Sequence, residues 1–96
     1  MNTYDLTGKI AVVAGGAKNL GGLISREFAK GGARIVVHYH SAPSQADAEA
    51  TVRAVQELGS DAIAVSGDLS KPANVAALFR AAKERFGGLD IAVNTV

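Results

Sequence analysis

The stretch that decides the fold is Ile10-Ala-Val-Val-Ala-Gly-Gly-Ala-Lys-Asn-Leu-Gly-Gly22, in which an apolar strand runs into glycines and then into an amphipathic helix. Glycines let the backbone turn sharply and lie close to a ligand. The free N–H groups at the start of the following helix point at any anion that binds there. This stretch therefore predicts a phosphate-binding turn, with a pyrophosphate group as its expected ligand.

Spacing excludes two of the three common glycine-rich turns. Gly16 and Gly21 have the separation found in nucleoside-triphosphate loops, but Gly22 and Leu23 stand where that motif has a lysine and a serine or threonine. The G-x-G-x-x-G pattern, started at Gly15, would need glycines at positions 17 and 20, which hold alanine and leucine. The spacing that remains is Ala-Gly-x-x-x-Asn-Leu-Gly over residues 14–21.

Four short apolar runs, typical of buried strands, alternate with helical patterns along the chain. The predicted strands are Lys9 to Ala14, Ala33 to Tyr39, Ala62 to Gly67 and Asp90 to Asn94. This alternation predicts the α/β class, a three-layer Rossmann-type parallel sheet. Right-handed crossovers leave few topologies, and we expect the strand order 3-2-1-4, with the first two helices on one face and the third on the other.

Each predicted helix has an apolar stripe and is followed by glycine. We expect Ser44 and Ser70 to cap the second and third helices. The stripes are Leu20, Ile24 and Phe28 in the first helix, Ala48, Val52, Val55 and Leu58 in the second, and Val75, Leu78, Phe79, Ala82 and Phe86 in the third. Strands two and three are added on one side of strand one, and strand four is added on the other. The carboxyl ends of strands one and four, and with them Gly15 and Asn94, should therefore border one ligand crevice.

The glycine turn resembles the T-G-x-x-x-G-x-G segment of the short-chain dehydrogenase/reductase family, with Ala14 in place of the threonine and Asn19 in place of the middle glycine. Asparagine tolerates left-handed backbone geometry and is a good helix N-cap, so the turn can still form. Two later segments also resemble the family. Gly67-Asp68-Leu69 is similar to its Gly-Asp-hydrophobic segment, and residues 89–96 to its D-I-L-V-N-N-A-G segment, with Thr95 and Val96 as departures.

The resemblance covers almost the whole chain and implies the N-terminal half of a classical member, similar to the 3-oxoacyl-acyl-carrier-protein reductases. Residues 1–96 would then form the N-terminal part of a single dinucleotide-binding domain. The resemblance places the cofactor phosphates among Gly15, Lys18, Asn19, Leu20 and Gly21, and the adenosine side of the cofactor against Asp68, Leu69 and Asn94.

Asp68 and Asn94 each have an alternative role. In the family the aspartate accepts a hydrogen bond from the adenine, and a carboxylate suits the exocyclic amino group. Alternatively, Asp68 caps the third helix or its turn, and Asn94 is an ordinary strand-end asparagine that makes a turn. Both alternatives stay open on the sequence.

The end of the second strand favours NADP over NAD. NAD-binding proteins usually have an acidic residue there, whereas this chain has Tyr39 and no Asp or Glu between Gly32 and Asp47. Basic and hydroxyl donors are present instead, and in the family a basic residue in the turn is typical of the NADP-preferring class. We expect the 2′-phosphate to be held by Lys18, His40 and Ser41, next to Tyr39.

Other ligand classes are disfavoured. His38 and His40 form an H-x-H pair that could chelate a divalent metal, but the chain has no cysteine and the nearest carboxylates follow on a separate helix, so we expect no metal site. A net charge of +1 without a basic patch argues against nucleic-acid binding. No apolar run approaches the length of a membrane span, and we expect a cytoplasmic protein without membrane partners.

Catalytic residues are not expected within these 96 residues. The family uses a tyrosine, a lysine four residues later and a nearby serine, whereas neither tyrosine of this chain is followed by such a lysine. In the family these groups come after the position of Val96. We therefore expect the cofactor-binding half of an NADP(H)-dependent oxidoreductase that acts on a small carbonyl or alcohol substrate and is a homo-oligomer at full length. The alternative is a non-catalytic nucleotide-binding or interaction module, complete at 96 residues.

Overall fold

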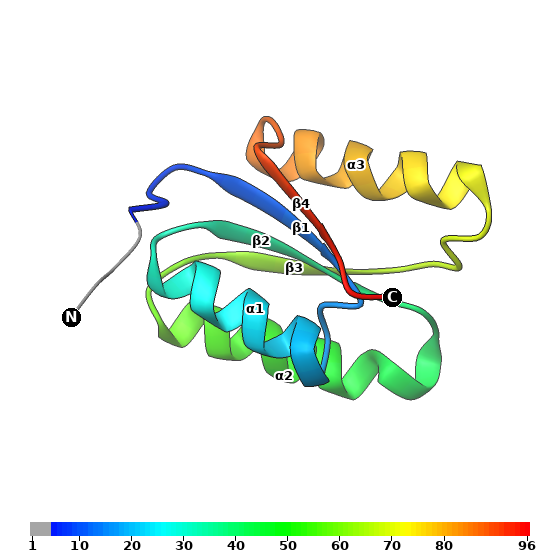
Figure 1. Ribbon diagram of the computed structural model, residues 1–96, viewed down its shortest axis with the longest axis horizontal. Coiled ribbons are helices and arrows are strands. Elements are labelled where there is room, and N and C mark those ends of the chain that lie inside the picture. The colour runs from blue at the N-terminus through cyan, green and yellow to red at the C-terminus, as the bar shows by residue number, and fades with distance from the viewer. Residues whose placement is uncertain (1–4) are drawn as a thin grey trace.

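The computed structural model describes residues 5–96, so the predicted start of the domain at residue 1 lies outside the described residues. Helices and strands alternate along the chain (Figure 1). In chain order the elements are β1 (Ile10–Ala14), α1 (Asn19–Lys30), β2 (Arg34–Tyr39), the short 3-10 helix η1 (Ala42–Ser44), α2 (Gln45–Glu57), β3 (Ala62–Ser66), α3 (Pro72–Phe86) and β4 (Ile91–Asn94).

The four strands form one parallel sheet in the order β3-β2-β1-β4. Helices α1 and α2 cover one face of this sheet, and α3 covers the other (Figure 1). The predicted class, strand order and distribution of helices are confirmed, and each predicted strand agrees with the observed bounds to within one residue. Only η1 was not predicted.

The alternation of side chains along β1 creates two separate cores. Ala11 and Val13 pack on the α1 and α2 side with Ile35 and Val37 of β2. On the α3 side, Ile10 and Val12 pack with Val36, Leu78 and Ala82. Because β1 and β2 are covered on both faces, their sequences are nearly continuous apolar runs.

Three residues of the predicted apolar stripes are exposed instead of buried: Leu20 (61%), Leu58 (44%) and Phe79 (41%). The buried face of α1 consists of small residues, Gly21, Gly22, Ser25 and Ala29, so the helix lies close to the sheet and Leu20 turns outward. Leu58 follows the last residue of α2 as its C-cap. Phe79 borders an open groove beside β4.

The predicted helix caps are only partly correct. Asn19 has the left-handed conformation, with φ of 55°, but the N-cap position of α1 belongs to Lys18. Ser44 is at the N-cap position of α2 as predicted, although its side chain makes no capping hydrogen bond because η1 leads directly into the helix. The prediction for Ser70 is wrong, since Lys71 is the N-cap of α3 and the Ser70 hydroxyl bonds to Asp68 instead.

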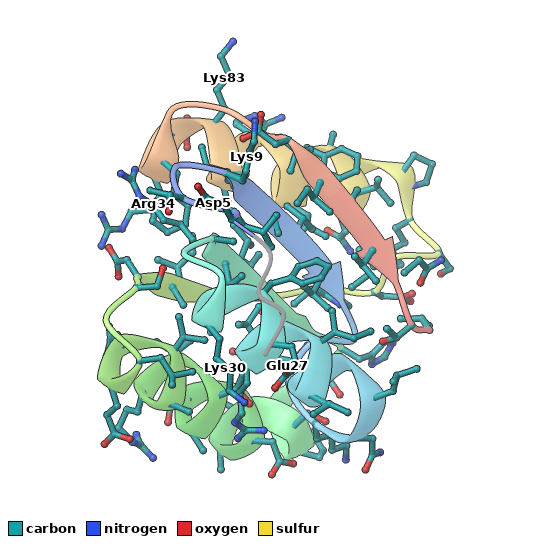
Figure 2. All side chains as sticks on the ribbon, turned by 60° about the vertical axis from the view of Figure 1, so that its left-hand side comes forward. Asp5, Lys9, Glu27, Lys30, Arg34 and Lys83 are labelled. Atoms are coloured by element: carbon teal, nitrogen blue, oxygen red, sulfur yellow. The ribbon has the colours of Figure 1, made fainter. Side chains whose placement is uncertain are left out.

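Charged side chains lie on the surface, several of them far from the glycine turn. Lys9 directly precedes β1, and Arg34 is the first residue of β2. Both lie at the opposite end of the sheet from that turn (Figure 2). Glu27 and Lys30 form an exposed ion pair on α1, with 2.7 Å between the carboxylate oxygen and Nζ. Among residues 5–96, no helix combines the length and the hydropathy that crossing a membrane would require.

Candidate functional site

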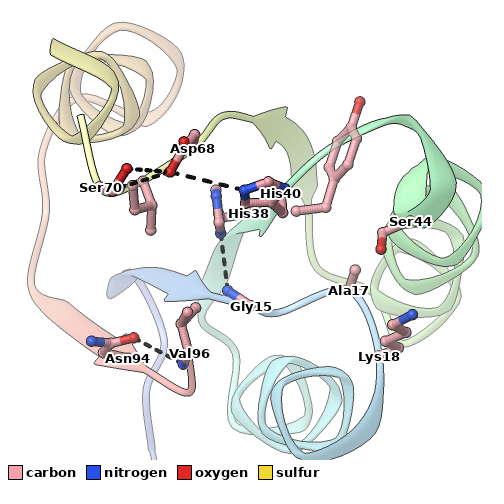
Figure 3. A pocket seen from close by; sticks show the side chains of 12 residues that line it. Gly15, Ala17, Lys18, His38, His40, Ser44, Asp68, Ser70, Asn94 and Val96 are labelled. Carbon is pink, nitrogen blue, oxygen red and sulfur yellow. Dashed lines mark hydrogen bonds and ion pairs between the residues drawn. The ribbon is translucent and has the colours of Figure 1, made fainter. Parts of the chain in front are cut away.

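A cavity of about 530 Å³ lies at the carboxyl ends of the strands (Figure 3). Its walls come from the turn after β1, the end of β2, the start of α2, the segment after β3 and the end of β4. The lining residues are Gly15, Ala17, Lys18, His38, Tyr39, His40, Ser44, Asp68, Leu69, Ser70, Asn94 and Val96. This is the position at which open α/β sheets bind their ligands.

Seven of the eleven predicted site residues line this cavity: Gly15, Lys18, Tyr39, His40, Asp68, Leu69 and Asn94. The other four, Asn19, Leu20, Gly21 and Ser41, are not among the lining residues. Asn19, Leu20 and Gly21 nevertheless form the first turn of α1, where the backbone amides have no intrahelical acceptor. At the start of α2, Ser44 lines the cavity where Ser41 was expected.

Three hydroxyl groups hold the carbonyl oxygens of the glycine turn. Thr95 donates to the carbonyl of Ala14 over 2.7 Å, and Thr51 of α2 donates to that of Ala17, also over 2.7 Å. The Ser25 hydroxyl lies 3.1 Å from the carbonyl oxygen of Gly16 and 2.9 Å from that of Gly21. These hydroxyl groups bond the turn to the end of β4, α1 and α2 from within the fold, and Ser25, which has one hydroxyl proton, can donate to one of its two carbonyl neighbours at a time.

The first turn of α1 lies directly against the glycine turn. A Cβ atom on Gly21 would lie 2.6 Å from the carbonyl carbon of Gly15 and would collide with the carbonyl oxygen of the same residue. Gly15 itself has a φ of 72°, a conformation that favours glycine. The backbone can follow this path only with glycine at both positions, and the path brings the amino end of α1 to the cavity.

His38 is buried beneath the cavity, with 2% of its surface exposed. Its Nδ1 accepts a hydrogen bond from the Gly15 amide over 3.0 Å, and its Nε2 lies 2.8 Å from the carbonyl oxygen of Gly67. Both ring nitrogens are therefore engaged within the fold, so the H-x-H pair does not present two free metal ligands. The position of His40 differs, because its side chain is exposed at the rim.

Asp68 shapes the turn that leads into α3. Its Oδ1 accepts hydrogen bonds from the Ser70 amide over 2.9 Å and from the Ser70 hydroxyl over 2.7 Å. The hydrogen bond from the Ser70 side chain is the main reason why the pKa of Asp68 lies below its ordinary value. The His40 Nε2 lies 3.9 Å from the same oxygen. An ionised carboxylate has about four lone-pair positions, so Asp68, which lines the cavity, keeps free acceptor capacity.

Asn94 also makes a local turn, because its Oδ1 accepts a hydrogen bond from the Val96 amide over 2.9 Å. The turn-forming alternatives for Asp68 and Asn94 are thus both observed. Their contacts with a nucleotide stay predictions.

Lys18 and His40 supply the basic side chains of the cavity wall. Lys18 lies on the same side of the cavity as Ser44, whereas Asp68 and Asn94 lie on the other side (Figure 3). The Lys18 Nζ is 3.9 Å from a carboxylate oxygen of Asp47 on α2, and both side chains are about half exposed. A charge pair of this kind is weak in water, so Lys18 can turn toward an anion at low cost.

Sequence reasoning missed the residues that support the turn from below. Ser25 and Thr51 are fully buried polar residues, and neither was recognised as part of the site. A signal was available for Thr51, because it lies at helical spacing between Ala48 and Val55 on the apolar stripe. A buried hydroxyl on such a stripe needs a hydrogen-bond acceptor, here the carbonyl of Ala17.

Comparison with known proteins gives consistent matches. Residues 9–96 match the family model for short chain dehydrogenase. Glucose 1-dehydrogenase 2 of Bacillus subtilis is 43% identical over 90 residues, which are 94% of this chain and 34% of that protein. For 3beta-hydroxysteroid dehydrogenase 1 of Eggerthella lenta the identity is 47% over 90 residues, again 94% of this chain and 34% of that protein.

Solved structures agree with these sequence matches. The crystal structure of a short chain dehydrogenase from Burkholderia cenocepacia J2315 in complex with NADP has a TM-score of 0.88 and 38% identity, and covers 94% of this chain and 36% of that one. This chain therefore spans about a third of the length of the relatives that it matches.

Proposed function

Since this chain belongs to the short chain dehydrogenase family, we propose that it is the NADP(H)-binding part of an oxidoreductase that transfers hydride between the nicotinamide and a small carbonyl or alcohol substrate. The observation that carries the proposal is the cavity at the carboxyl ends of the strands, where the amino end of α1, the Asp68 carboxylate and Lys18 meet. Helix amides and a lysine suit phosphates, and an acceptor-only carboxylate suits the amino group of adenine.

Within this proposal, each part of the site binds one part of the cofactor. Gly15, Lys18, Asn19, Leu20 and Gly21 surround the pyrophosphate, which the free backbone amides of the first turn of α1 bind. The Gly15 amide is held by His38, and the Lys18 ammonium group is left for the 2′-phosphate. The adenosine lies against Asp68, Leu69 and Asn94. Near the end of β2, Lys18, His40 and Ser41 bind the 2′-phosphate beside Tyr39. Ser44 joins them because it lines the cavity on the same side as Lys18 (Figure 3).

The bound nicotinamide would supply the hydride acceptor or donor, and the residues described here bind and orient it. The tyrosine followed four residues later by a lysine, which the family uses for catalysis, does not occur among residues 1–96. Cytoplasmic location and assembly into a homo-oligomer also stay predictions.

The experiment compares the dissociation constants of NADPH and NADH for the protein expressed from its complete natural gene, measured by isothermal titration calorimetry. We expect NADPH to bind at least about tenfold more tightly, because one charge-assisted contact to the 2′-phosphate contributes about 1.5 kcal/mol or more. Equal binding of both cofactors would contradict the proposed NADP preference. Binding of neither would contradict the proposed function itself.

A pair of matched variants locates the preference within the site. Lys18→Gln should weaken NADPH binding about tenfold and change NADH binding by less than about threefold. Lys30→Gln removes the lysine at the other end of α1, where it pairs with Glu27, and should leave both constants unchanged. If the two variants behave alike, Lys18 does not contact the 2′-phosphate.

A further inference from the structure

His38 connects three strand ends at the floor of the cavity. It belongs to β2, the strand between β1 and β3, and its side chain is almost completely buried. On one side the Gly15 amide, at the start of the glycine turn, donates to Nδ1. On the other side the carbonyl of Gly67, immediately before Asp68, lies at hydrogen-bond distance from Nε2.

These two bonds determine the protonation of the ring. A backbone amide can only donate, so Nδ1 must be the acceptor in the bond with Gly15, and it carries no proton. A backbone carbonyl can only accept, so Nε2 must carry the proton that bonds to Gly67. Rotation of the ring by 180° about its axis would place carbon atoms at both contacts and satisfy neither group. The fold therefore selects the neutral ring with its proton on Nε2.

The backbone on both sides of His38 reinforces the same connection. The Gly16 amide donates to the carbonyl of His38 over 3.0 Å, and the Gly67 amide donates to the carbonyl of Tyr39 over 3.0 Å. The strand end thus holds the glycine turn and the Asp68 segment on its two sides. A dinucleotide bound as proposed above would span these two segments, its phosphates on the first and its adenine on the second.

We propose that His38 is a positioning residue for the nucleotide, which fixes the glycine turn relative to the Asp68 segment and does so only as the neutral Nε2–H tautomer. The proposal rests on the proposed function, since it assumes that a nucleotide occupies the cavity. It does not require His38 to touch the nucleotide. The ring acts through the Gly15 amide and the Gly67 carbonyl.

The test compares His38→Leu and His38→Gln in the protein expressed from its complete natural gene, with NADPH as the probe. Leucine fills the space but satisfies neither backbone group, whereas the glutamine amide offers one acceptor and one donor, as the neutral ring does. We expect the dissociation constant to rise at least about tenfold in His38→Leu, and to stay within about threefold of the natural protein in His38→Gln. Far-ultraviolet circular dichroism establishes that each variant is folded.

Two binding results would overturn the proposal: a folded His38→Leu variant that binds NADPH as the natural protein does, or a His38→Gln variant that binds as weakly as His38→Leu. Should His38→Leu not fold, the glutamine variant alone decides by the same threefold limit. If the natural protein itself does not bind NADPH, the proposed function fails, and with it this inference. Binding by the natural protein together with no effect of His38→Leu rejects the inference alone.

An independent measurement addresses the tautomer. Long-range ¹H–¹⁵N correlation spectra of the imidazole at neutral pH should show an unprotonated Nδ1 and a protonated Nε2 for His38. A proton on Nδ1, or on both nitrogens, would overturn the assignment, whatever the binding experiments show.

Discussion

At the scale of single residues, the site depends on two glycines of α1, which have no Cβ atom, as well as on its polar side chains. Gly21 and Gly22 are consecutive buried residues of α1, yet only Gly21 faces the backbone of the glycine turn at close range. A Cβ on Gly22 would be 3.3 Å from the nearest atom, the carbonyl oxygen of Ala17. The two positions therefore differ in what they tolerate, although they look alike in the sequence.

Gly21→Ala should lower the free energy of unfolding by about 2 kcal/mol or more, because the new methyl group must push α1 away from Gly15. Gly22→Ala should change it by no more than about 1 kcal/mol, since a mild contact is offset by the better helix propensity of alanine. Urea unfolding monitored by circular dichroism measures both values. Equal effects of the two substitutions would contradict the close approach of α1 to the turn.

Asp68 and Ser70 provide a second prediction at this scale. Ser70→Ala removes the side-chain hydrogen bond that contributes most to the low pKa of Asp68, while the backbone hydrogen bond remains. The pKa of Asp68 should therefore rise toward its ordinary value of 3.8. A carboxyl ¹³C NMR titration measures it, with Ser60→Ala as a control that lies outside this turn. An unchanged pKa in Ser70→Ala would contradict the observed geometry.

The sign of the effect on stability follows from the direction of this shift. Because the pKa of Asp68 is lower in the folded state than in the unfolded state, its stabilising contribution is complete above about pH 3.8. The contribution is lost as the pH falls through the folded-state pKa. Ser70→Ala should therefore reduce the loss of stability in acid and leave its pH dependence near neutrality unchanged.

At the scale of elements, neighbouring residues of α3 have opposite environments. Leu78 is 2% exposed and packs with Val12 and Val36 beneath the helix, whereas Phe79 is 41% exposed. Phe79 lies over a groove between α3 and β4, together with Val75 and Val93. The apolar residues of α3 therefore extend beyond the face of the helix that packs on the sheet in residues 5–96.

Leu78→Ala should lower the free energy of unfolding by about 2–5 kcal/mol, because it leaves a cavity in the core under α3. Phe79→Ala should cost about 1 kcal/mol, since part of the ring is already in water and alanine has the higher helix propensity. Chemical denaturation of the 96-residue chain provides the comparison. A larger cost for Phe79→Ala than for Leu78→Ala would contradict the observed orientation of the helix.

At the scale of the whole molecule, β4 is joined to β1 by side chains at both ends of β4. Asp90 accepts a hydrogen bond from the Ile10 amide over 2.9 Å, and Thr95 donates to the carbonyl of Ala14. These contacts join residues about 80 positions apart, and they fix the edge strand beside the glycine turn. Thr95, which departs from the family segment in the sequence, thus has a structural role here.

Asp90→Ala should lower the free energy of unfolding by about 1–3 kcal/mol, because it leaves the partly buried Ile10 amide without its acceptor. Asp5→Ala is the matched control. Its carboxylate accepts a hydrogen bond from the Thr7 amide in an exposed position, where water can replace it, so its loss should cost clearly less than the loss of Asp90. Thermal unfolding of both variants tests the difference, and similar costs would show that β4 is not held through Asp90.

The sequence alone determined the strand–turn–helix character of residues 10–22, the order of the strands and the end of the sheet at which the cavity opens. These properties depend on local conformational limits, on apolar periodicity and on the handedness of crossovers, which can all be read along the chain. Only the tertiary structure decided that Leu20 and Phe79 point outward, and that His38, Ser25 and Thr51 support the turn. Such contacts join residues that are distant in the sequence. Helical spacing indicates that Thr51 is buried, but the acceptor that it meets depends on how the elements pack, which the local sequence does not specify.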